Sequence, residues 1–201
     1  MIQSLTAEKL ACARGERVLF EDLSFHLKAG QALAVEGANG AGKTSLLRLI
    51  AGFIAPRTGR VVIKCQAGEI ADGEERGKQA GWLGHQDGLK PQLTVREQLS
   101  FFASLYDSKA DRAAALQEVG LSRQADFPCR FLSAGQKRRL ALARLLVCNR
   151  PLWLLDEPFA ALDAQGQDLI ARTMTRHCAS GGMVIAATHD PLGLGNVSLR
   201  L

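Results

Sequence analysis

Residues 32–44, which read ALAVEGANGAGKT, join a short apolar run to a glycine-rich turn. The run Ala32–Glu36 is hydrophobic at four successive positions, which is typical of a strand covered on both faces. The turn Gly37–Thr44 has the spacing GxxxxGK followed by Ser or Thr. The next residues predict a helix that is closed by Gly52 and has an apolar face formed by Leu46, Leu47, Ile50 and Ala51. A strand, a glycine turn and a helix in this order predict a phosphate-binding loop.

The chemistry of this loop follows from its residue types. Glycines permit positive φ, so that backbone N–H groups can curl around phosphate oxygens at a helix N-terminus. Lys43 is expected to reach the β and γ phosphates of a nucleotide, and Thr44 is expected to offer its hydroxyl to Mg²⁺. The candidate phosphate-binding residues of the loop are Gly37, Ala38, Asn39, Gly40, Ala41, Gly42, Lys43, Thr44 and Ser45.

A second buried-type strand, Leu152–Leu155, runs directly into two carboxylates, Asp156 and Glu157. Beside a phosphate loop, Asp156 is the candidate for the metal side of the nucleotide site. Glu157 can accept a proton from the water that attacks the γ-phosphate, or orient that water. Such general-base assistance is worth about 10²–10⁴-fold in rate.

Upstream of this pair, residues 131–139 read FLSAGQKRR. Ser133 with Gln136 three positions later predicts a capping box at the start of a helix through Cys148. A capped helix does not by itself explain Gly135, since glycine in a helix costs about 1 kcal/mol against alanine. An anion that approaches the backbone there does explain it.

The stretch LSAGQ resembles the LSGGQ signature of ABC ATPases, with Ala134 in place of the middle glycine. Other motifs of that family follow the same order along nearly the whole chain. The resemblance implies roles for Gln86 as the glutamine that links the nucleotide site to a helical subdomain and contacts Mg²⁺, for Asp163 in a loop that crosses a dimer interface, and for His189 as a histidine that contacts the γ-phosphate. It also implies that Ser133, Gly135 and Gln136 contact ATP bound by a second copy.

The implied fold is α/β: a P-loop NTPase (RecA-like) core with a mostly parallel sheet, N-terminal antiparallel strands and an inserted helical subdomain. Residues 1–201 are expected to form one ABC ATPase domain. Residues 1–91 and 150–201 form its core in this prediction, and residues 92–149 form the helical signature subdomain. The strands expected from hydrophobic patterning are Val18–Phe20, Leu23–Leu27, Ala32–Glu36, Leu152–Leu155 and Met183–Thr188. The expected helices outside the loop helix are those near residues 95–106, 114–119, 135–148 and 166–178.

Two positions depart from the family pattern. ABC proteins usually stack an aromatic residue on adenine just before an early glycine, but here Arg14 precedes Gly15. A guanidinium plane can also stack on a base, so Arg14 is a candidate adenine contact. Ala134 adds a methyl group near the phosphate-facing turn, which is tolerated if the Ser133 N–H and Gly135 carry the contacts.

Composition restricts the remaining choices. The net charge is +5, and the densest basic cluster, Lys137–Arg139, is expected to be a solvated helix face rather than a nucleic-acid footprint. Five cysteines without CxxC spacing favour reduced thiols over zinc or disulfides. The N-terminal residues do not have a signal-peptide pattern, and no apolar run approaches 18 residues. Any membrane component is therefore expected to be another chain.

A narrower resemblance rests on Trp82–Gln86 (WLGHQ), LSAGQ and Thr188–Leu192 (THDPL). Together with the short length, these residues look like the ATP-binding subunit of the cytochrome c maturation exporter, often called the haem exporter. That family implies a homodimer joined through the nucleotide sites, separate integral-membrane permease subunits, and a peripheral location on the cytoplasmic face of the bacterial inner membrane. No direct nucleic-acid contact is expected. Direct haem binding is not expected either, because the four histidines are dispersed.

Three alternatives stay open from the residues. The chain can serve an ABC importer or exporter of another substrate, because substrate contacts lie in other chains. It can be a soluble ABC ATPase that acts on nucleic acid or ribosomes, although such relatives usually carry tandem units or coiled-coil insertions. A P-loop kinase or GTPase of another class is opposed by LSAGQ and by the Asp156–Glu157 pair.

Overall fold

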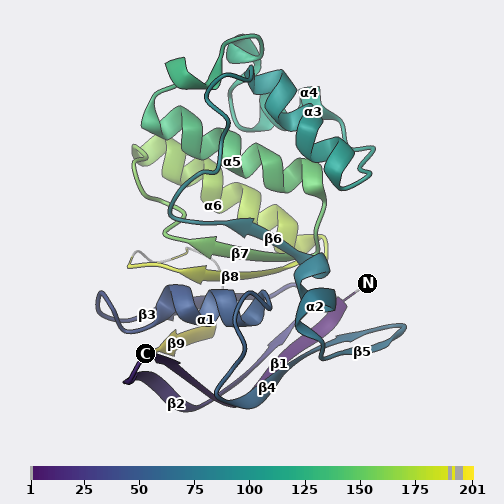
Figure 1. Cartoon of the computed structure of the whole chain (residues 1–201). Helices are drawn as coiled ribbons and strands as arrows, with labels where there is room; N and C mark the ends of the chain where they lie inside the picture. Colours follow the sequence, from purple (N-terminus) through teal and green to yellow (C-terminus); the bar gives the residue numbers. More distant parts are fainter. Residues whose placement is uncertain (1, 190–191, 193–196) are drawn as a thin grey trace.

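The computed structural model describes residues 2–189, 192 and 197–201, which form two β-sheets with helices between and above them (Figure 1). The five-stranded sheet has the order β6-β7-β8-β3-β9, and all of its pairings are parallel. Its strands are β3 (Ala32–Glu36), β6 (Ala80–Leu83), β7 (Leu152–Asp156), β8 (Met183–Ala187) and β9 (Val197–Arg200). The four-stranded antiparallel sheet has the order β2-β1-β4-β5. Its strands are β1 (Ile2–Arg14), β2 (Arg17–Lys28), β4 (Thr58–Cys65) and β5 (Gly68–Ile70).

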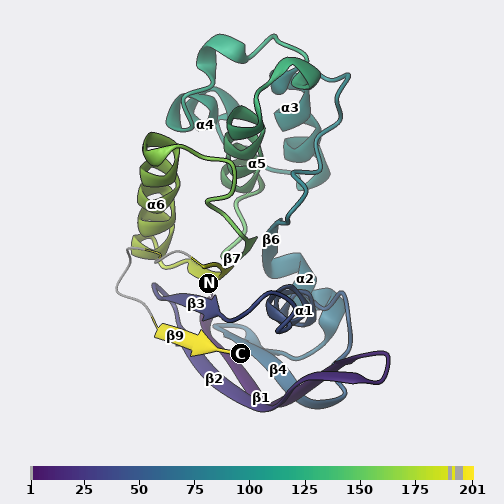
Figure 2. The same cartoon turned by 90° about the vertical axis from the view of Figure 1, so that its left-hand side faces the viewer.

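The helix that follows the phosphate loop, α1 (Lys43–Ile50), lies between the two sheets in both views (Figures 1 and 2). Its leucines Leu46, Leu47 and Leu49 are fully buried and pack in one core cluster with residues of both sheets. Gly52 has a φ of +79° and ends the helix as expected. Burial of this apolar face fixes the loop at the carboxyl end of β3.

Strand β7 shows how the parallel sheet separates two cores. Leu152 and Leu154 face α1, whereas Trp153 and Leu155 face the helices on the opposite side. Successive side chains of a strand point to opposite faces, so a continuous apolar run is what a doubly covered strand requires. The expectations for β3, β7 and β8 are confirmed to within one residue at each end.

The helices on the far side of the parallel sheet stand apart from α1 and the antiparallel sheet (Figure 2). Their bounds are α3 (Val95–Leu105), α4 (Arg112–Glu118), α5 (Ala134–Cys148) and α6 (Ala164–Ala179). The first three lie in the segment 92–149, and their expected positions are confirmed. The predicted capping box of Ser133 and Gln136 is also present. Among the described residues, no helix has both the length and the apolar character needed to cross a membrane.

The antiparallel sheet departs from the expectation in detail. The two short strands expected within residues 18–27 are one continuous strand, β2, with a positive φ at Asp22. Strand β1 was not predicted from the sequence, because register shifts near Lys9 interrupt the alternation of apolar and polar residues. The segment 58–83 also holds β4, β5, α2 (Gly73–Gln79) and β6, none of which was expected. Several of these elements are only three to seven residues long, too short for a clear period.

Candidate nucleotide site

A cavity of about 350 Å³ opens beyond the carboxyl ends of β3 and β7. Open parallel sheets bind ligands at this edge. The cavity is lined by Arg14, Leu19, Ala38, Asn39, Gly40, Gly42, Lys43, Thr44, Ser45, His85, Asp156 and Glu157. Ten of these twelve residues were predicted as site residues from the sequence, and the structure brings them together around one space.

The loop that forms one wall of the cavity has the backbone conformation that its glycines permit. Gly37, Gly40 and Gly42 have φ values of +151°, +81° and +109°. A Cβ at Gly42 would lie 3.1–3.2 Å from side-chain atoms of Leu19 and Phe20, so a larger residue would have to displace them slightly in addition to adopting the positive φ. Gly42 is the N-cap of α1, and no described side chain caps this helix end. Its first N–H groups therefore offer donors for phosphate oxygens.

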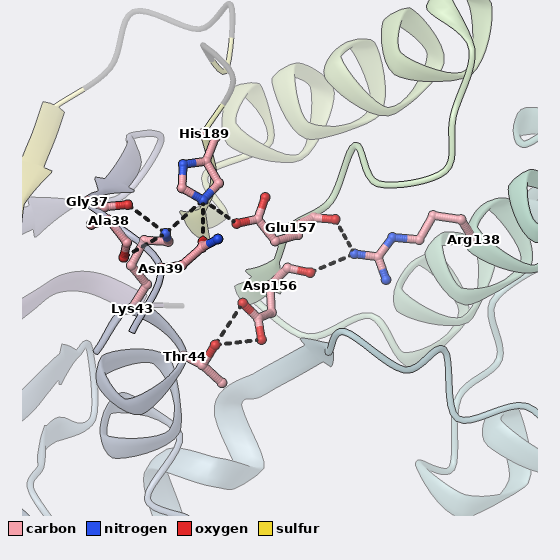
Figure 3. Close-up of polar contacts among 9 residues, drawn as sticks. All are labelled: Gly37, Ala38, Asn39, Lys43, Thr44, Arg138, Asp156, Glu157 and His189. Atoms are coloured by element: carbon pink, nitrogen blue, oxygen red, sulfur yellow. Dashed lines mark hydrogen bonds and ion pairs between the residues drawn. The ribbon is translucent and has the colours of Figure 1, made fainter. Parts of the chain in front are cut away.

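Thr44 and Asp156 meet at the base of this wall (Figure 3). The Thr44 hydroxyl donates to the Asp156 carboxylate, at 3.1 Å from Oδ1 and 2.9 Å from Oδ2. Asp156 is buried at the end of β7. Hydroxyl, carboxylate and phosphate oxygens are the ligands that Mg²⁺ prefers. These residues therefore fit Mg²⁺ carried in with the nucleotide, where the ion would neutralise phosphate charge.

Lys43 is held over the loop that it follows. Its Nζ donates to the carbonyl of Gly37 at 2.7 Å and lies 3.0 Å from Nε2 of His189. The same His189 nitrogen lies 3.1 Å from Oδ1 of Asn39 and 3.5 Å from Oε1 of Glu157. One ring nitrogen cannot accept from Lys43 and donate to Asn39 at once, so the tautomer selects between these partners. The cluster brings a cation, an imidazole and a carboxylate together, and two of its members, Lys43 and Glu157, line the cavity.

Glu157 has a backbone conformation that is unusual for its residue type. Its φ is +49°, a region that non-glycine residues adopt rarely and at a cost of about 1–3 kcal/mol. Its N–H donates to the carbonyl of Ala187 at 2.8 Å, and its own carbonyl accepts from the N–H of Ala160 at 3.1 Å. These bonds stabilise a turn that directs the carboxylate toward His189 and the cavity (Figure 3).

The signature residues lie at the start of α5 and are not among the residues lining the cavity. The Ser133 N–H donates to Oε1 of Gln136 at 2.9 Å, and the Gln136 N–H donates to Oγ of Ser133 at 3.2 Å. A Cβ at Gly135 would lie 3.2 Å from the carbonyl oxygen of Ala161. This close approach gives Gly135 a reason within one chain, so its presence no longer argues for an anion alone. Contacts between these signature residues (Ser133, Gly135 and Gln136) and ATP bound by a second copy stay a prediction.

Two residues that line the cavity, His85 and Leu19, were not predicted from the sequence. His85, not its neighbour Gln86, lines the cavity, and both are exposed. Leu19 lines the cavity beside Arg14 and offers an apolar surface. A leucine in an alternating strand gives no sequence signal of ligand contact.

Asp163, another residue with a predicted role, is not among the residues that line the cavity. The Asp163 carboxylate caps α6 by accepting from the Gly166 N–H at 2.8 Å. Of the THDPL motif, Asp190 and Pro191 lie outside the described residues.

Arg138 corrects the expectation of a solvated face at Lys137–Arg139. Its side chain is buried, with the residue 3% exposed, whereas its two neighbours are half-buried. The guanidinium donates to backbone carbonyls at the ends of β6 and β7. A run of three basic residues on a helix hides this difference, because the partners of the buried one lie far away in sequence.

Comparisons with known proteins agree with this geometry. Residues 20–160 match the family model described as ABC transporter. The chain is 48% identical over 202 residues to the cytochrome c biogenesis ATP-binding export protein CcmA of Rhodopseudomonas palustris strain BisB5, covering 98% of this chain and 97% of that protein. The protein of the same name from strain BisB18 is 51% identical over 198 residues, with the same coverages. The solved structure of a putative ABC transporter ATP-binding protein from Pyrococcus furiosus superposes with a TM-score of 0.85 at 22% identity, covering 98% and 97% of the two chains.

A nucleotide loop, a buried carboxylate opposite it and a capped signature helix define an ATP-binding cassette. The chain belongs to the ABC transporter family of ATP-binding subunits, and it is an ATP-hydrolysing transport ATPase. Within this family it is similar over nearly its whole length to cytochrome c biogenesis ATP-binding export proteins.

Proposed function

We propose that this chain hydrolyses ATP for a cytochrome c maturation exporter, as a homodimer that acts on separate permease chains at the cytoplasmic face of the bacterial inner membrane. The observation that carries the proposal is the identity of 48–51% over 98% of the chain to proteins named for cytochrome c biogenesis export. The matched region covers 98% of the chain and so includes both the loop helix and the helical segment.

In this proposal the loop Gly37–Ser45 binds the phosphates of ATP, and Lys43 turns from its carbonyl and His189 contacts to the β and γ phosphates. Thr44 and Asp156 would hold the Mg²⁺ ion, and Gln86, which does not line the cavity in this structure, would approach as a further ligand. Glu157 accepts the proton of the attacking water, and His189 contacts the γ-phosphate. What supports these roles is that Nζ of Lys43 lies 3.0 Å and Oε1 of Glu157 lies 3.5 Å from the same nitrogen of His189, so the three side chains converge on one place.

The second half of each ATP site comes from the partner copy in this proposal. Ser133, Gly135 and Gln136 lie at the start of α5, outside the cavity of their own chain. A helix N-terminus attracts anions, but here Gln136 accepts the Ser133 N–H. Binding of a partner's phosphate through that N–H requires the Gln136 side chain to move. Asp163 would lie in the loop that crosses the interface.

The chain's genetic role gives the test of the exporter assignment. Deletion of the gene, or its replacement by Glu157→Gln, is expected to abolish or sharply reduce covalently bound haem in periplasmic c-type cytochromes. Haem synthesis and b-type cytochromes should be spared, and the wild-type gene should restore the c-type signal on a haem-stained gel. Normal c-type cytochromes in the deletion strain would exclude the maturation role. The chain would then be the ATPase subunit of another ABC transporter.

A soluble ABC ATPase that acts on nucleic acid is the second candidate, favoured only by the positive net charge. It predicts that nucleic acid, rather than membrane proteins, co-purifies with the chain.

The proposed exporter role also includes an expectation about haem. Purified alone, the chain is expected to show no stoichiometric haem binding in a visible absorption titration. A haem Soret shift at one equivalent would contradict that expectation.

A further inference from the structure

Arg138 makes an unusual set of contacts for a residue outside the nucleotide cavity. Its Nε donates to the carbonyl of Pro158 at 3.3 Å, and Nη1 donates to the carbonyl of Gly84 at 2.7 Å and to Oδ1 of Asp87 at 3.0 Å. Its Nη2 donates to the carbonyls of Asp156 at 2.7 Å and Glu157 at 2.5 Å (Figure 3). A guanidinium has five N–H donors in a fixed planar fork. Each of them therefore has an acceptor.

The place of these contacts in the sheet explains why an arginine is needed. The ladder between β6 and β7 ends at the pair Leu83 and Leu155. Gly84 and Asp156 come next on the two strands, and their carbonyls both accept from Arg138 instead of from a strand. A buried carbonyl without a donor costs about 1–3 kcal/mol. The guanidinium thus continues the sheet where β6 turns away from β7.

The same guanidinium reaches the residue with the strained backbone. Glu157 holds its φ of +49° between the Ala187 carbonyl on one side and two donors, Arg138 and Ala160, on the other. A strained conformation persists only where its surroundings over-determine it. Arg138 is the one of these three partners that comes from α5, the helix that begins at the signature residues.

A second arginine of α5 ties the helix to the same region of the core. Arg144 is buried, and it donates to the carbonyls of Asp87 at 2.8 Å and Trp82 at 3.2 Å. Residues 82–87 are therefore held by both arginines, and only Arg138 also reaches the catalytic turn. Arg144 therefore only holds residues 82–87, whereas Arg138 also contacts the backbone of Glu157.

We propose that Arg138 is a positioning residue for hydrolysis, which sets the orientation of the Glu157 carboxylate by holding the peptide groups of Asp156 and Glu157. Because Arg138 belongs to α5, the placement of the general base depends on where the signature helix lies against the core. This inference rests on the proposed role of Glu157 as proton acceptor. A misplacement of about 1 Å at a reacting group can cost about 10²-fold in rate.

The test is a double-mutant cycle on the full chain with Arg138→Lys and Glu157→Gln. Lysine keeps the charge but cannot reproduce the planar fork. Arg138→Lys is expected to lower kcat by about 10- to 100-fold, with the Kd for ATP changed by less than about threefold because the residue lies outside the cavity. In the Glu157→Gln background the same change should lower the residual rate by less than about threefold, since residues that act as a unit are not additive. Arg139→Gln, the adjacent position with one carbonyl contact at 3.4 Å, is the matched control with unchanged kcat.

Two results would overturn the proposal: wild-type kcat in Arg138→Lys, or an equal fold-loss in both backgrounds, which marks a merely structural role. A Glu157→Gln variant with normal turnover is a different failure, because it removes the proposed general base itself. If Arg138→Lys does not fold by circular dichroism, Asp87→Ala carries the same cycle, because it removes the oxygen that accepts from Nη1 of Arg138. Its expected loss of about two- to fivefold in kcat must likewise vanish on the Glu157→Gln background, and persistence there overturns the proposal.

Discussion

The Thr44 hydroxyl lies within 3.1 Å of both carboxylate oxygens of Asp156, although the two residues are 112 positions apart in the chain. The first follows the glycine loop at the start of α1, and the second ends β7. Packing of α1 beneath the parallel sheet brings them together. The result is a set of oxygen atoms suited to Mg²⁺.

The Thr44–Asp156 pair predicts that hydrolysis requires Mg²⁺ and that the Thr44 hydroxyl is one of its ligands. Chelation of Mg²⁺ should abolish hydrolysis, and Thr44→Val should raise the Mg²⁺ concentration needed for half-maximal rate by about tenfold or more. Thr44→Ser keeps the hydroxyl and is the matched control, with a requirement close to wild type. Equal Mg²⁺ requirements for Thr44→Val and Thr44→Ser would exclude the hydroxyl as a ligand.

His177 gives a prediction for stability against pH. It stacks on Trp153 with ring centroids 3.9 Å apart, and burial lowers its pKa to about 4 from an ordinary value of about 6.5. Between these values the unfolded chain binds more protons, so the free energy of unfolding rises with pH. The contribution is fully present above about pH 6.5 and is lost as the pH falls toward 4, with a size on the order of 2–3 kcal/mol.

The matched variant is His177→Phe, which keeps an aromatic stack but cannot be protonated. The Pro151 carbonyl, which His177 approaches at 3.2 Å, still accepts the N–H of Met183. Urea denaturation at several pH values should show a shallower loss of stability for His177→Phe between pH 6.5 and 4. Parallel curves for the two proteins would mean that His177 is not the group responsible.

The strongest local patterns were sufficient to predict the parallel core. Strands β3 and β7 are continuous apolar runs, and the Ser133–Gln136 capping box marks the first turn of α5. Short elements such as β6 carry too few residues for a period, and their strand state depends on pairing with β7. The burial of Arg138 could not be predicted, because all of its acceptors lie between 18 and 54 residues away.

Arg14 lines the cavity beside Leu19, and adenine stacking on its guanidinium stays a prediction. Arg14→Ala should weaken ATP binding by about 0.5–2 kcal/mol, while Arg14→Tyr should retain or improve it, because either side chain offers a planar face. Isothermal titration with ATP measures both. An unchanged Kd for Arg14→Ala would show that the base is held elsewhere.

The composite site predicts complementation between two inactive variants. Lys43→Ala damages the loop of its own chain, and Gly135→Asp places a carboxylate against phosphate bound by the partner, so each homodimer should be inactive. A mixed dimer retains one intact site, and mixing should restore a fraction of the wild-type rate, with permease present if assembly requires it.

Gly135→Ala is the control for the close approach of the Ala161 carbonyl, since it adds the Cβ without the charge. It should keep more activity than Gly135→Asp. If mixed dimers form but hydrolyse ATP no faster than either parent, one of two conclusions follows. Either the sites are not shared by two chains, or one intact site cannot hydrolyse ATP while the other is inactive.

In the proposed mechanism Glu157 takes the proton from the attacking water. The direct measurement is steady-state ATP hydrolysis by Glu157→Gln, with ATP affinity and oligomeric state determined on the same preparation. We expect a rate about 10²–10⁴-fold below wild type, retained ATP binding and an ATP-stabilised dimer on a sizing column, because the amide keeps the shape of the side chain but cannot accept the proton. Hydrolysis near the wild-type rate by this variant would contradict the account.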